Sequence, residues 1–331
     1  MKTYWFALAA TVALAAGPEY KLLDKIKLGG TNGWDYMAVD SSAERLYVSH
    51  TNQVEVIDLK TNKPMGKIAD TPGVHGIALA QDLGKGFISN GRDNSVTIFD
   101  LKTLAATGKV KTGENPDAIL YDSASKKVFA FNGRSHDATI IDAKTGMVSA
   151  TINVGGKPEF SQNDGKGKVW VNIEDTAELI EIDAAKSTIT QRIKLAPCEE
   201  PTGLARDAKK NRLFVACSNK TLAVVDPAAG KVLGTVAIGA GADGVAFDSG
   251  FAYTSNGADG TITVVGEQGG KWEAVGTIQT TRSARTITVD PKTHRLYLPA
   301  AEAGPAPPVK EGKQGRPQLA PDSFHVMVLG K

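Results

Sequence analysis

The chain has 331 residues, of which 41% are hydrophobic and 22% are charged, so it is long enough and apolar enough to fold around a large core. Its 38 Lys and Arg residues nearly balance 36 Asp and Glu residues, and the net charge of +2 argues against strong binding to nucleic-acid backbones. Beyond the N-terminus, no stretch approaches the roughly 20 apolar residues of a membrane-spanning helix, so we expect no stable membrane insertion of the mature chain.

The N-terminal residues have the features of a secretory signal peptide. Lys2 gives a positively charged start, an apolar run follows, and Ala13 and Ala15 form a small-residue cleavage site. We therefore expect residues 1–16 to be removed and residues 17–331 to act in the periplasm or as a secreted protein. We also expect a monomer. An uncleaved N-terminal anchor is the alternative.

The rest of the chain repeats itself at a nearly constant period. Seven short segments, such as WDYMAVD and ADGVAFD, end at equivalent anchor positions that are 40 to 43 residues apart. The anchors are Asp40, Ala80, Asp122, Asp164, Asp207, Asp248 and Asp290. A period of this length is typical of the blades of a β-propeller.

Each repeat contains the patterns of four β-strands. The anchor is followed by a polar turn and a second run such as RLYVSH from Arg45, then by a third run such as VEVIDLKT from Val54, and finally by a shorter fourth run. Runs of Val, Ile, Phe and Tyr separated by Asp, Asn, Lys and Gly turns are typical of antiparallel hairpins. The sequence therefore predicts an all-β fold, a single seven-bladed β-propeller with four antiparallel strands per blade over residues 17–331.

The first and last repeats supply a way to close the ring. The seventh repeat has a third run at Val326 but no fourth run before Lys331, whereas residues 20–28 resemble the fourth runs of the other repeats. A ring of blades avoids exposed sheet edges only when its first and last blades are joined. We expect residues 20–28 to complete the last blade as its N-terminal closing strand.

The last repeat also carries the longest insertion, residues 301–323, between its second and third runs. Its Pro and Gly content predicts an irregular, flexible flap. Blade topology places this flap on the side of the ring where the innermost strands begin. It is either a lid or binding loop, or a segment without function.

These features resemble the YVTN-repeat family of seven-bladed propellers, which includes YncE-like exported proteins. The similarity rests on the repeat spacing, on second runs like RLYVSH and on third runs such as VEVIDLKT and VTIFDLKT, and it covers nearly all of the mature chain. The sixth repeat departs most, with GEQG where other repeats have an Asp-x-Lys-Thr pattern. The resemblance implies a mostly noncatalytic family in which some members bind DNA.

One polar residue stands five positions before each anchor, where the innermost strand begins at the mouth of the central channel. These residues are Asp35, His75, Asp117, Glu159, Thr202, Asp243 and Arg285. Carboxylates at one radius would raise one another's pKa values, which favours a convergent ligand-binding site. The alternative is a wet channel mouth that needs no ligand.

No cofactor is predicted from motifs. A divalent cation is the one candidate, because carboxylate oxygens suit Ca²⁺ while His75 would suit a transition metal.

The loops after the second runs add further ligand-binding candidates, namely Arg92, Arg134 and His136. Two arginines near one opening can hold a carboxylate or phosphate through paired hydrogen bonds.

Cys198 and Cys217 are the only cysteines of the chain. An oxidising compartment would allow them to form a disulfide, and two unpaired buried thiols are the alternative.

The sequence favours a binding protein over an enzyme. It contains no G-x-S-x-G or C-x-x-C-H motif and shows no catalytic nucleophile. We expect the channel mouth to bind a small molecule, a polymer or a protein. Single-stranded DNA is a weaker candidate, because the net charge is close to zero.

Similarity to other propellers suggests two alternative functions. Similar seven-bladed propellers hydrolyse sugar lactones, and here a ring carboxylate or His75 would activate water while Arg92, Arg134 or Arg285 stabilises the oxyanion. The haem-d1 domains of nitrite reductases have a related repeat, which suggests instead an accessory protein of a redox or metal system.

Overall fold

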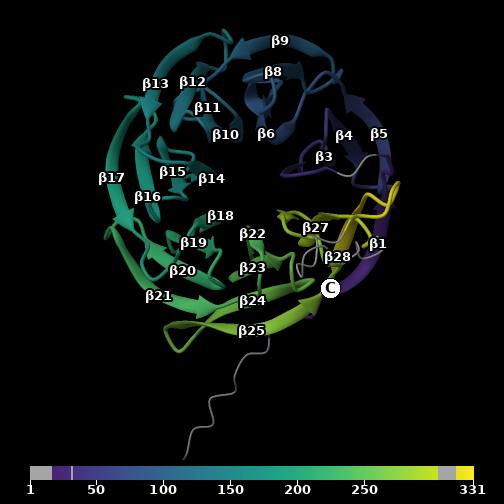
Figure 1. Cartoon of the computed structure of the whole chain (residues 1–331), viewed down its shortest axis with the longest axis vertical. Helices are drawn as coiled ribbons and strands as arrows, with labels where there is room; N and C mark the ends of the chain where they lie inside the picture. Colours follow the sequence, from purple (N-terminus) through teal and green to yellow (C-terminus); the bar gives the residue numbers. More distant parts are fainter. Residues whose placement is uncertain (1–16, 31–32, 305–317) are drawn as a thin grey trace, which may run out of the picture.

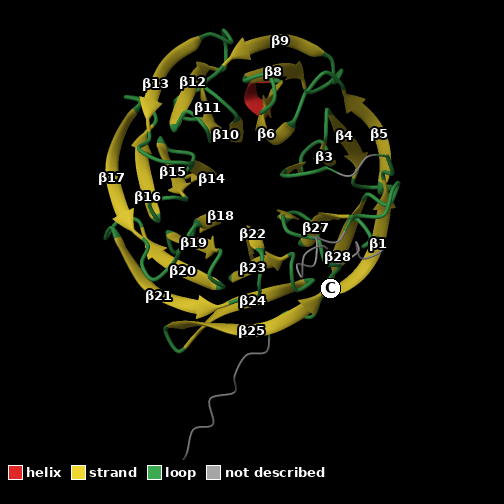
Figure 2. Ribbon diagram, in the orientation of Figure 1, coloured by secondary structure: helices red, strands yellow, loops and turns green. Residues whose placement is uncertain are grey.

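The computed structural model describes residues 17–30, 33–304 and 318–331 and shows seven four-stranded antiparallel sheets arranged in a ring (Figure 1). The described residues form strands joined by turns and loops, with one 3-10 turn, η1 (Gln81–Leu83), in the second blade (Figure 2). The predicted seven-bladed β-propeller is therefore confirmed. The predicted signal peptide, residues 1–16, lies outside the described residues. No helix in the described part of the chain has the length and apolar character needed to cross a bilayer.

Each blade runs from an innermost strand at the axis to an outer strand at the rim. The innermost strands are β2 (Met37–Asp40), β6 (Val74–Ala80), β10 (Pro116–Asp122), β14 (Pro158–Asn163), β18 (Pro201–Asp207), β22 (Ala242–Asp248) and β26 (Thr288–Asp290). The second strands are β3 (Arg45–His50), β7 (Lys85–Asn90), β11 (Lys127–Asn132), β15 (Lys168–Ile173), β19 (Arg212–Cys217), β23 (Phe251–Asn256) and β27 (Arg295–Ala300). The third strands are β4 (Gln53–Asp58), β8 (Ser95–Asp100), β12 (Asp137–Asp142), β16 (Glu178–Asp183), β20 (Thr221–Asp226), β24 (Thr261–Gln268) and β28 (His325–Gly330). The outer strands are β5 (Lys63–Ile68), β9 (Ala106–Lys111), β13 (Val148–Asn153), β17 (Thr188–Lys194), β21 (Lys231–Ala237), β25 (Lys271–Gln279) and β1 (Lys21–Lys27).

The ring is closed by its N-terminal strand. In the last blade the strand order is β1, β28, β27, β26, so the first strand of the chain takes the outer position. β1 pairs antiparallel with β28 from Lys21 opposite Gly330 to Lys27 opposite His325, with a register shift between Leu22 and Asp24. Figure 1 shows β1 in purple beside β28 in yellow. The predicted closure by residues 20–28 is confirmed.

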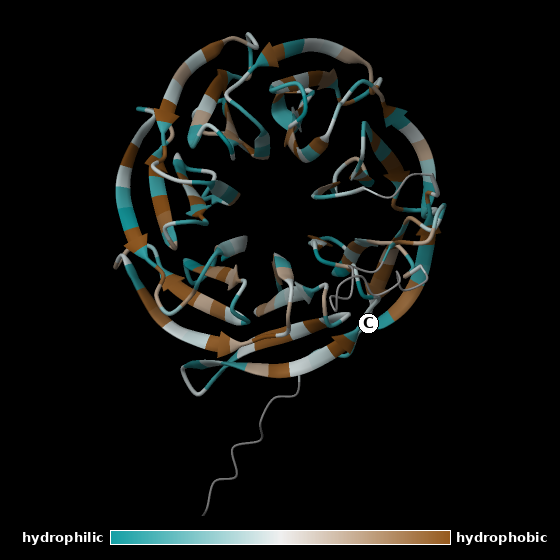
Figure 3. Ribbon diagram, in the orientation of Figure 1, coloured by the Kyte–Doolittle hydropathy of each residue, from teal (hydrophilic) through white to brown (hydrophobic). Residues whose placement is uncertain are grey.

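The core lies between neighbouring blades. Second and third strands such as β11 and β12 are buried along almost their whole length, whereas outer strands such as β13 and β17 alternate between more exposed and more buried residues. Figure 3 shows hydrophilic and hydrophobic residues following one another along the outer strands. This is the pattern expected when every blade packs on two neighbours and only the rim faces water.

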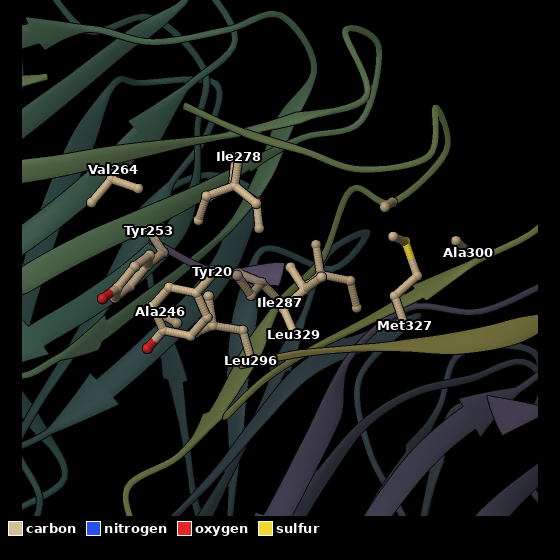
Figure 4. Close-up of a cluster of buried hydrophobic side chains, with 13 residues drawn as sticks. Tyr20, Ala246, Tyr253, Val264, Ile278, Ile287, Leu296, Ala300, Met327 and Leu329 are labelled. Carbon is tan, nitrogen blue, oxygen red and sulfur yellow. The ribbon is translucent and has the colours of Figure 1, made fainter. Parts of the chain in front are cut away.

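The closing segment is also packed into this core. Tyr20, just before β1, meets Tyr253 of the sixth blade edge to face, with ring centroids 5.6 Å apart. Leu296, Met327 and Leu329 of the last blade complete this cluster (Figure 4). The N-terminal segment thus ties the sixth and seventh blades together through apolar contacts as well as through strand pairing.

The predicted flap, residues 301–323, is paired at its base. Ala303 and Leu319 form an isolated antiparallel bridge, so the two ends of the insertion run beside each other. Residues 305–317 between these ends lie outside the described residues.

A disulfide joins Cys198 to Cys217, with the two Cα atoms 5.5 Å apart. It connects the loop before β18 to the end of β19, and both cysteines are buried. The disulfide therefore cross-links two segments of the fifth blade, on the side of the molecule where the innermost strands begin.

Candidate binding site at the channel mouth

Seven polar residues occupy equivalent places where the innermost strands begin, one from each blade. They are Asp35, His75, Asp117, Glu159, Thr202, Asp243 and Arg285, here named the polar ring. Each lies within, or just before, the innermost strand of its blade, and these strands surround the axis in Figure 1. Contacts between side chains of different blades link five of them, Asp35, His75, Asp117, Asp243 and Arg285.

His75 lies between two carboxylates from the neighbouring blades. Its Nδ1 atom is 2.6 Å from Oδ2 of Asp35 and 3.6 Å from Oδ1 of Asp117. Burial would lower the pKa of His75, but the hydrogen bond with Asp35 and the charges of both carboxylates outweigh it and raise this pKa to about 9. Burial raises the pKa of Asp117 to about 6, although the charge of His75 opposes the shift. The imidazole is therefore positively charged at neutral pH and links three blades.

Arg285 joins the last blade to the first at the mouth. Its guanidinium forms an ion pair with Asp243, and its Nη2 atom lies 3.7 Å from Oδ1 of Asp35. The same nitrogen donates a hydrogen bond to the carbonyl of Trp34 at 2.9 Å. Burial would lower the pKa of Arg285, but the charges of Asp35 and Asp243 raise it. Burial raises the pKa of Asp243 in spite of the Arg285 charge.

Glu159 has a cationic partner that the repeat pattern did not predict. Nζ of Lys157 is 2.8 Å from Oε1 of Glu159 and also pairs with Glu174, which follows β15. Burial raises the pKa of Glu159 to about 8, the charge of Asp117 adds to the shift, and Lys157 opposes it. The pattern missed Lys157 because this residue stands two positions before the equivalent ring position.

Thr202 is the ring member that takes no part in the charged network. Its hydroxyl donates to the carbonyl of Ala242 in the next blade at 3.1 Å and lies 3.4 Å from the carbonyl of Ala216. The structure therefore places Thr202 at the predicted level, where it links the fifth blade to the sixth.

Acidic side chains outnumber basic side chains in this network. The carboxylates are Asp35, Asp117, Glu159, Glu174 and Asp243, and the cationic side chains are His75, Lys157 and Arg285. The raised pKa values of Asp117, Glu159 and Asp243 are what crowded, poorly solvated carboxylates show. Positive charge brought to the mouth would relieve this crowding.

Two aromatic side chains close the channel at the next level of the innermost strands. Tyr36 comes from the first blade and Phe160 from the fourth, and their rings meet edge to face with centroids 4.9 Å apart. The other blades place smaller residues at this level, namely Gly76, Ala118, Gly203, Gly244 and Thr286. A Cβ atom on Gly203 would lie 2.9 Å from the backbone of Gly244, so glycine lets neighbouring strands approach closely here.

Two cavities flank the contact between Tyr36 and Phe160. The larger, about 180 Å³, is lined by residues such as Gln162 and Arg206, and the smaller, about 50 Å³, reaches Ile119. The aromatic pair thus divides the channel. The polar ring lies at the mouth next to this aromatic floor, and we call this end of the channel the cup.

Arg92, Arg134 and His136 lie in exposed turns outside the polar ring. Arg92 donates to the side chain of Asn52 at 3.2 Å, and His136 has a φ of 56° in the turn between β11 and β12. Within the described ranges, no ion pair connects any of the three to the ring. The structure does not bring these predicted candidates into the charged network, because they occupy solvent-facing turns.

Comparisons with known proteins identify the fold and no activity. Residues 44–198, less than half of the chain, match the family described as Domain of unknown function (DUF5074). A solved structure titled Kuenenia stuttgartiensis Hydrazine Synthase is similar to this chain with a TM-score of 0.67 and 14% sequence identity, over 79% of this chain and 91% of that chain. No curated protein matches the chain. At this level of identity the similarity shows a propeller fold alone.

Proposed function

We propose that this chain is an exported binding protein that holds a small, positively charged ligand in the cup at its channel mouth. The observation that carries the proposal is the charged network itself, in which five acidic side chains meet three basic side chains around one opening. Such convergence of half-buried polar groups with raised pKa values is typical of binding sites. The floor formed by Tyr36 and Phe160 favours a ligand that sits at the mouth over one that threads the channel.

Export is the second part of the proposal. The predicted signal peptide supports it, and so does the disulfide between Cys198 and Cys217, since such bonds persist in oxidising compartments. The resemblance to YVTN-repeat propellers agrees with a noncatalytic role. A disulfide at the mouth side of the fifth blade would also keep the start of β18 in place around the cup.

The proposal is tested by ligand identification on protein purified gently from its source, followed by a thermal-shift screen with small cations, polyamines and cationic amino acids. We expect binding that raises the unfolding temperature and that is lost in Asp35→Asn. The matched control is Glu114→Gln, because Glu114 is an exposed carboxylate on the same side of the molecule. If no compound stabilises the wild type, or if both variants bind equally well, the proposal is wrong.

A lactone hydrolase is the second candidate. The hydrogen bond between Asp35 and His75 favours it, because a carboxylate that orients a histidine is a common catalytic arrangement. Against it stands the pKa of His75 near 9, which keeps the imidazole protonated and unable to act as a base at neutral pH. Lactone turnover that rises with pH and disappears in His75→Gln would support the hydrolase. No turnover with aliphatic or sugar lactones would remove it.

A further inference from the structure

We propose that Asp35, His75 and Asp117 form a binding site for one divalent transition-metal ion. The inference rests on the proposed binding role of the mouth and names the chemical class of the ligand. Nδ1 of His75 and one oxygen of each carboxylate lie within 4.8 Å of one another. The three side chains are mostly buried, with exposed fractions of 12%, 28% and 14% for Asp35, His75 and Asp117.

The distances are close to those of a coordinated ion. Metal bonds of about 2.0 to 2.2 Å at tetrahedral angles hold two ligand atoms about 3.3 to 3.6 Å apart. Nδ1 of His75 and Oδ1 of Asp117 already lie 3.6 Å apart. Nδ1 of His75 and Oδ2 of Asp35 lie 2.6 Å apart, which is a hydrogen bond held by a proton. On metal binding this proton leaves to solvent, the two atoms separate by about 1 Å, and the ion takes the place of the proton with no change of oxidation state.

A buried oxygen atom that accepts no hydrogen bond supplies an independent observation. Oδ1 of Asp117 is inaccessible to solvent and accepts no hydrogen bond from the described residues. A carboxylate oxygen can only accept, and leaving such an atom unpaired inside a protein costs free energy. This oxygen is the one that lies nearest Nδ1 of His75. An ion between them would give it a partner.

Hydrogen bonds with serine and threonine hydroxyls hold the backbone of the ligands in place. The N–H of Asp35 donates to the Ser49 hydroxyl at 2.7 Å, and the Thr286 hydroxyl donates to the carbonyl of Asp35 at 2.7 Å. The hydroxyl of Ser89 donates to the carbonyl of Asp117 at 2.5 Å. Metal sites need ligands that are positioned before the ion arrives, and these bonds provide that rigidity.

The space around His75 is matched to its imidazole. A Cβ atom on Gly91 would lie 2.7 Å from Nε2 of His75, so only glycine leaves room for the ring in this orientation. Gly91 therefore acts as a positioning residue for the imidazole.

The donor set indicates the kind of metal. One imidazole nitrogen and two carboxylate oxygens suit Zn²⁺, Mn²⁺ or Co²⁺ better than Ca²⁺ or Mg²⁺, which prefer oxygen ligands throughout. The two carboxylates balance the charge of a divalent ion once the imidazole is neutral. Three protein ligands leave at least one coordination position open toward the mouth.

The test uses the mature chain after treatment with a chelator. Calorimetry and native mass spectrometry with ZnCl₂ should show one ion per chain, and Co²⁺ should give visible absorption bands of a nitrogen and oxygen site. We expect His75→Gln and Asp117→Asn each to weaken Zn²⁺ binding at least about tenfold and to change or abolish the Co²⁺ bands. Circular dichroism and thermal unfolding of each variant establish that it is folded.

The matched control is His294→Gln. His294 also contacts an aspartate, Asp248, at 2.9 Å, but it lies at the opposite end of the blades with a single carboxylate. Its replacement should leave Zn²⁺ binding unchanged. Binding that survives His75→Gln, or that is lost equally in His294→Gln, overturns the metal site. If Zn²⁺, Mn²⁺ and Co²⁺ all fail to bind while an organic cation binds at the mouth, the metal inference is wrong and the proposed function stands. If neither kind of ligand binds, both are wrong.

Discussion

The two ends of the innermost strands carry aspartates in opposite environments. At the far face, Oδ1 of Asp40 accepts hydrogen bonds from the N–H groups of Ser42 and Ala43 and from the Ser42 hydroxyl. Burial would raise the pKa of Asp40, but these donors outweigh it and the pKa is lowered. At the mouth, Asp117 has no such turn to accept from, and its pKa is raised to about 6.

The difference separates aspartates that accept hydrogen bonds from their own turn from aspartates that pair with distant side chains. The far-face aspartates, and those of the third strands such as Asp58, accept N–H groups of the turn that follows them. These N–H groups compensate the charge within one blade, and Asp290 also accepts a hydrogen bond from Ser41 of the first blade. The ring carboxylates Asp35, Asp117 and Asp243 instead pair with side chains from other blades, and Glu159 pairs with Lys157 of its own blade.

The largest expected effect is a difference in stability between a variant at the far face and a variant at the mouth. Asp290→Ala at the far face should lower the free energy of unfolding by about 3 kcal/mol, because Asp290 accepts from Ser41 of the first blade, from Thr293 and from the N–H of Lys292. Asp117→Asn at the mouth should change it by less than about 1 kcal/mol, since it removes a crowded charge. Urea unfolding at neutral pH in the presence of a chelator measures both. Equal losses would contradict the comparison.

A smaller loss of stability is expected when Arg285, the cation that joins the last blade to the first, is replaced. Arg285→Met should destabilise the protein by about 2 kcal/mol, because it leaves the partly buried carboxylates of Asp35 and Asp243 without their partner. Adding Asp243→Asn should recover part of this loss, which a double-mutant cycle reports as a coupling energy. A strictly additive double variant would show that Arg285 does not act through Asp243.

The smallest expected effect is on the pH dependence of stability. Glu159 has a folded pKa of about 8 against an ordinary value of 4.5, so its protonated form stabilises the folded state below pH 4.5 and this stabilisation is lost as the pH rises to 8. Glu159→Gln should therefore flatten the fall of stability over this range, by on the order of 1 to 2 kcal/mol. Glu174 keeps Lys157 paired in the variant. The free energy of unfolding is measured at pH 5 and at pH 8 for the wild type and the variant. An equal difference between the two pH values in both proteins would exclude this role of Glu159.

The repeat spacing predicted the fold because each blade repeats one pattern of strands and turns. A common spacing from the anchors also placed residues five positions before each anchor at one level, which is why Asp35, His75 and Asp117 meet. The sequence predicted closure by β1 because the seventh repeat lacks a fourth run of its own. These predictions required only the position of each residue relative to the other residues of its own blade.

What the sequence did not predict depends on relations between blades. Tyr36 and Phe160 come from the first and fourth blades, and their contact follows from the width of the channel, which no local pattern encodes. Lys157 is not at one of the seven positions that stand five residues before an anchor, so the repeat pattern did not indicate it as a site residue. Arg92 and Arg134 lie in turns on the mouth side, and whether such a side chain reaches the polar ring depends on the backbone angles of its turn.

The most direct test of the central claim, that the mouth is a ligand-binding cup, is a crystal structure of the protein purified without chelators. The account predicts electron density for a bound cation or cationic molecule in contact with Asp35 and Asp117, above the Tyr36 ring. A mouth that holds only solvent, or a ligand bound on the far face instead, would contradict it.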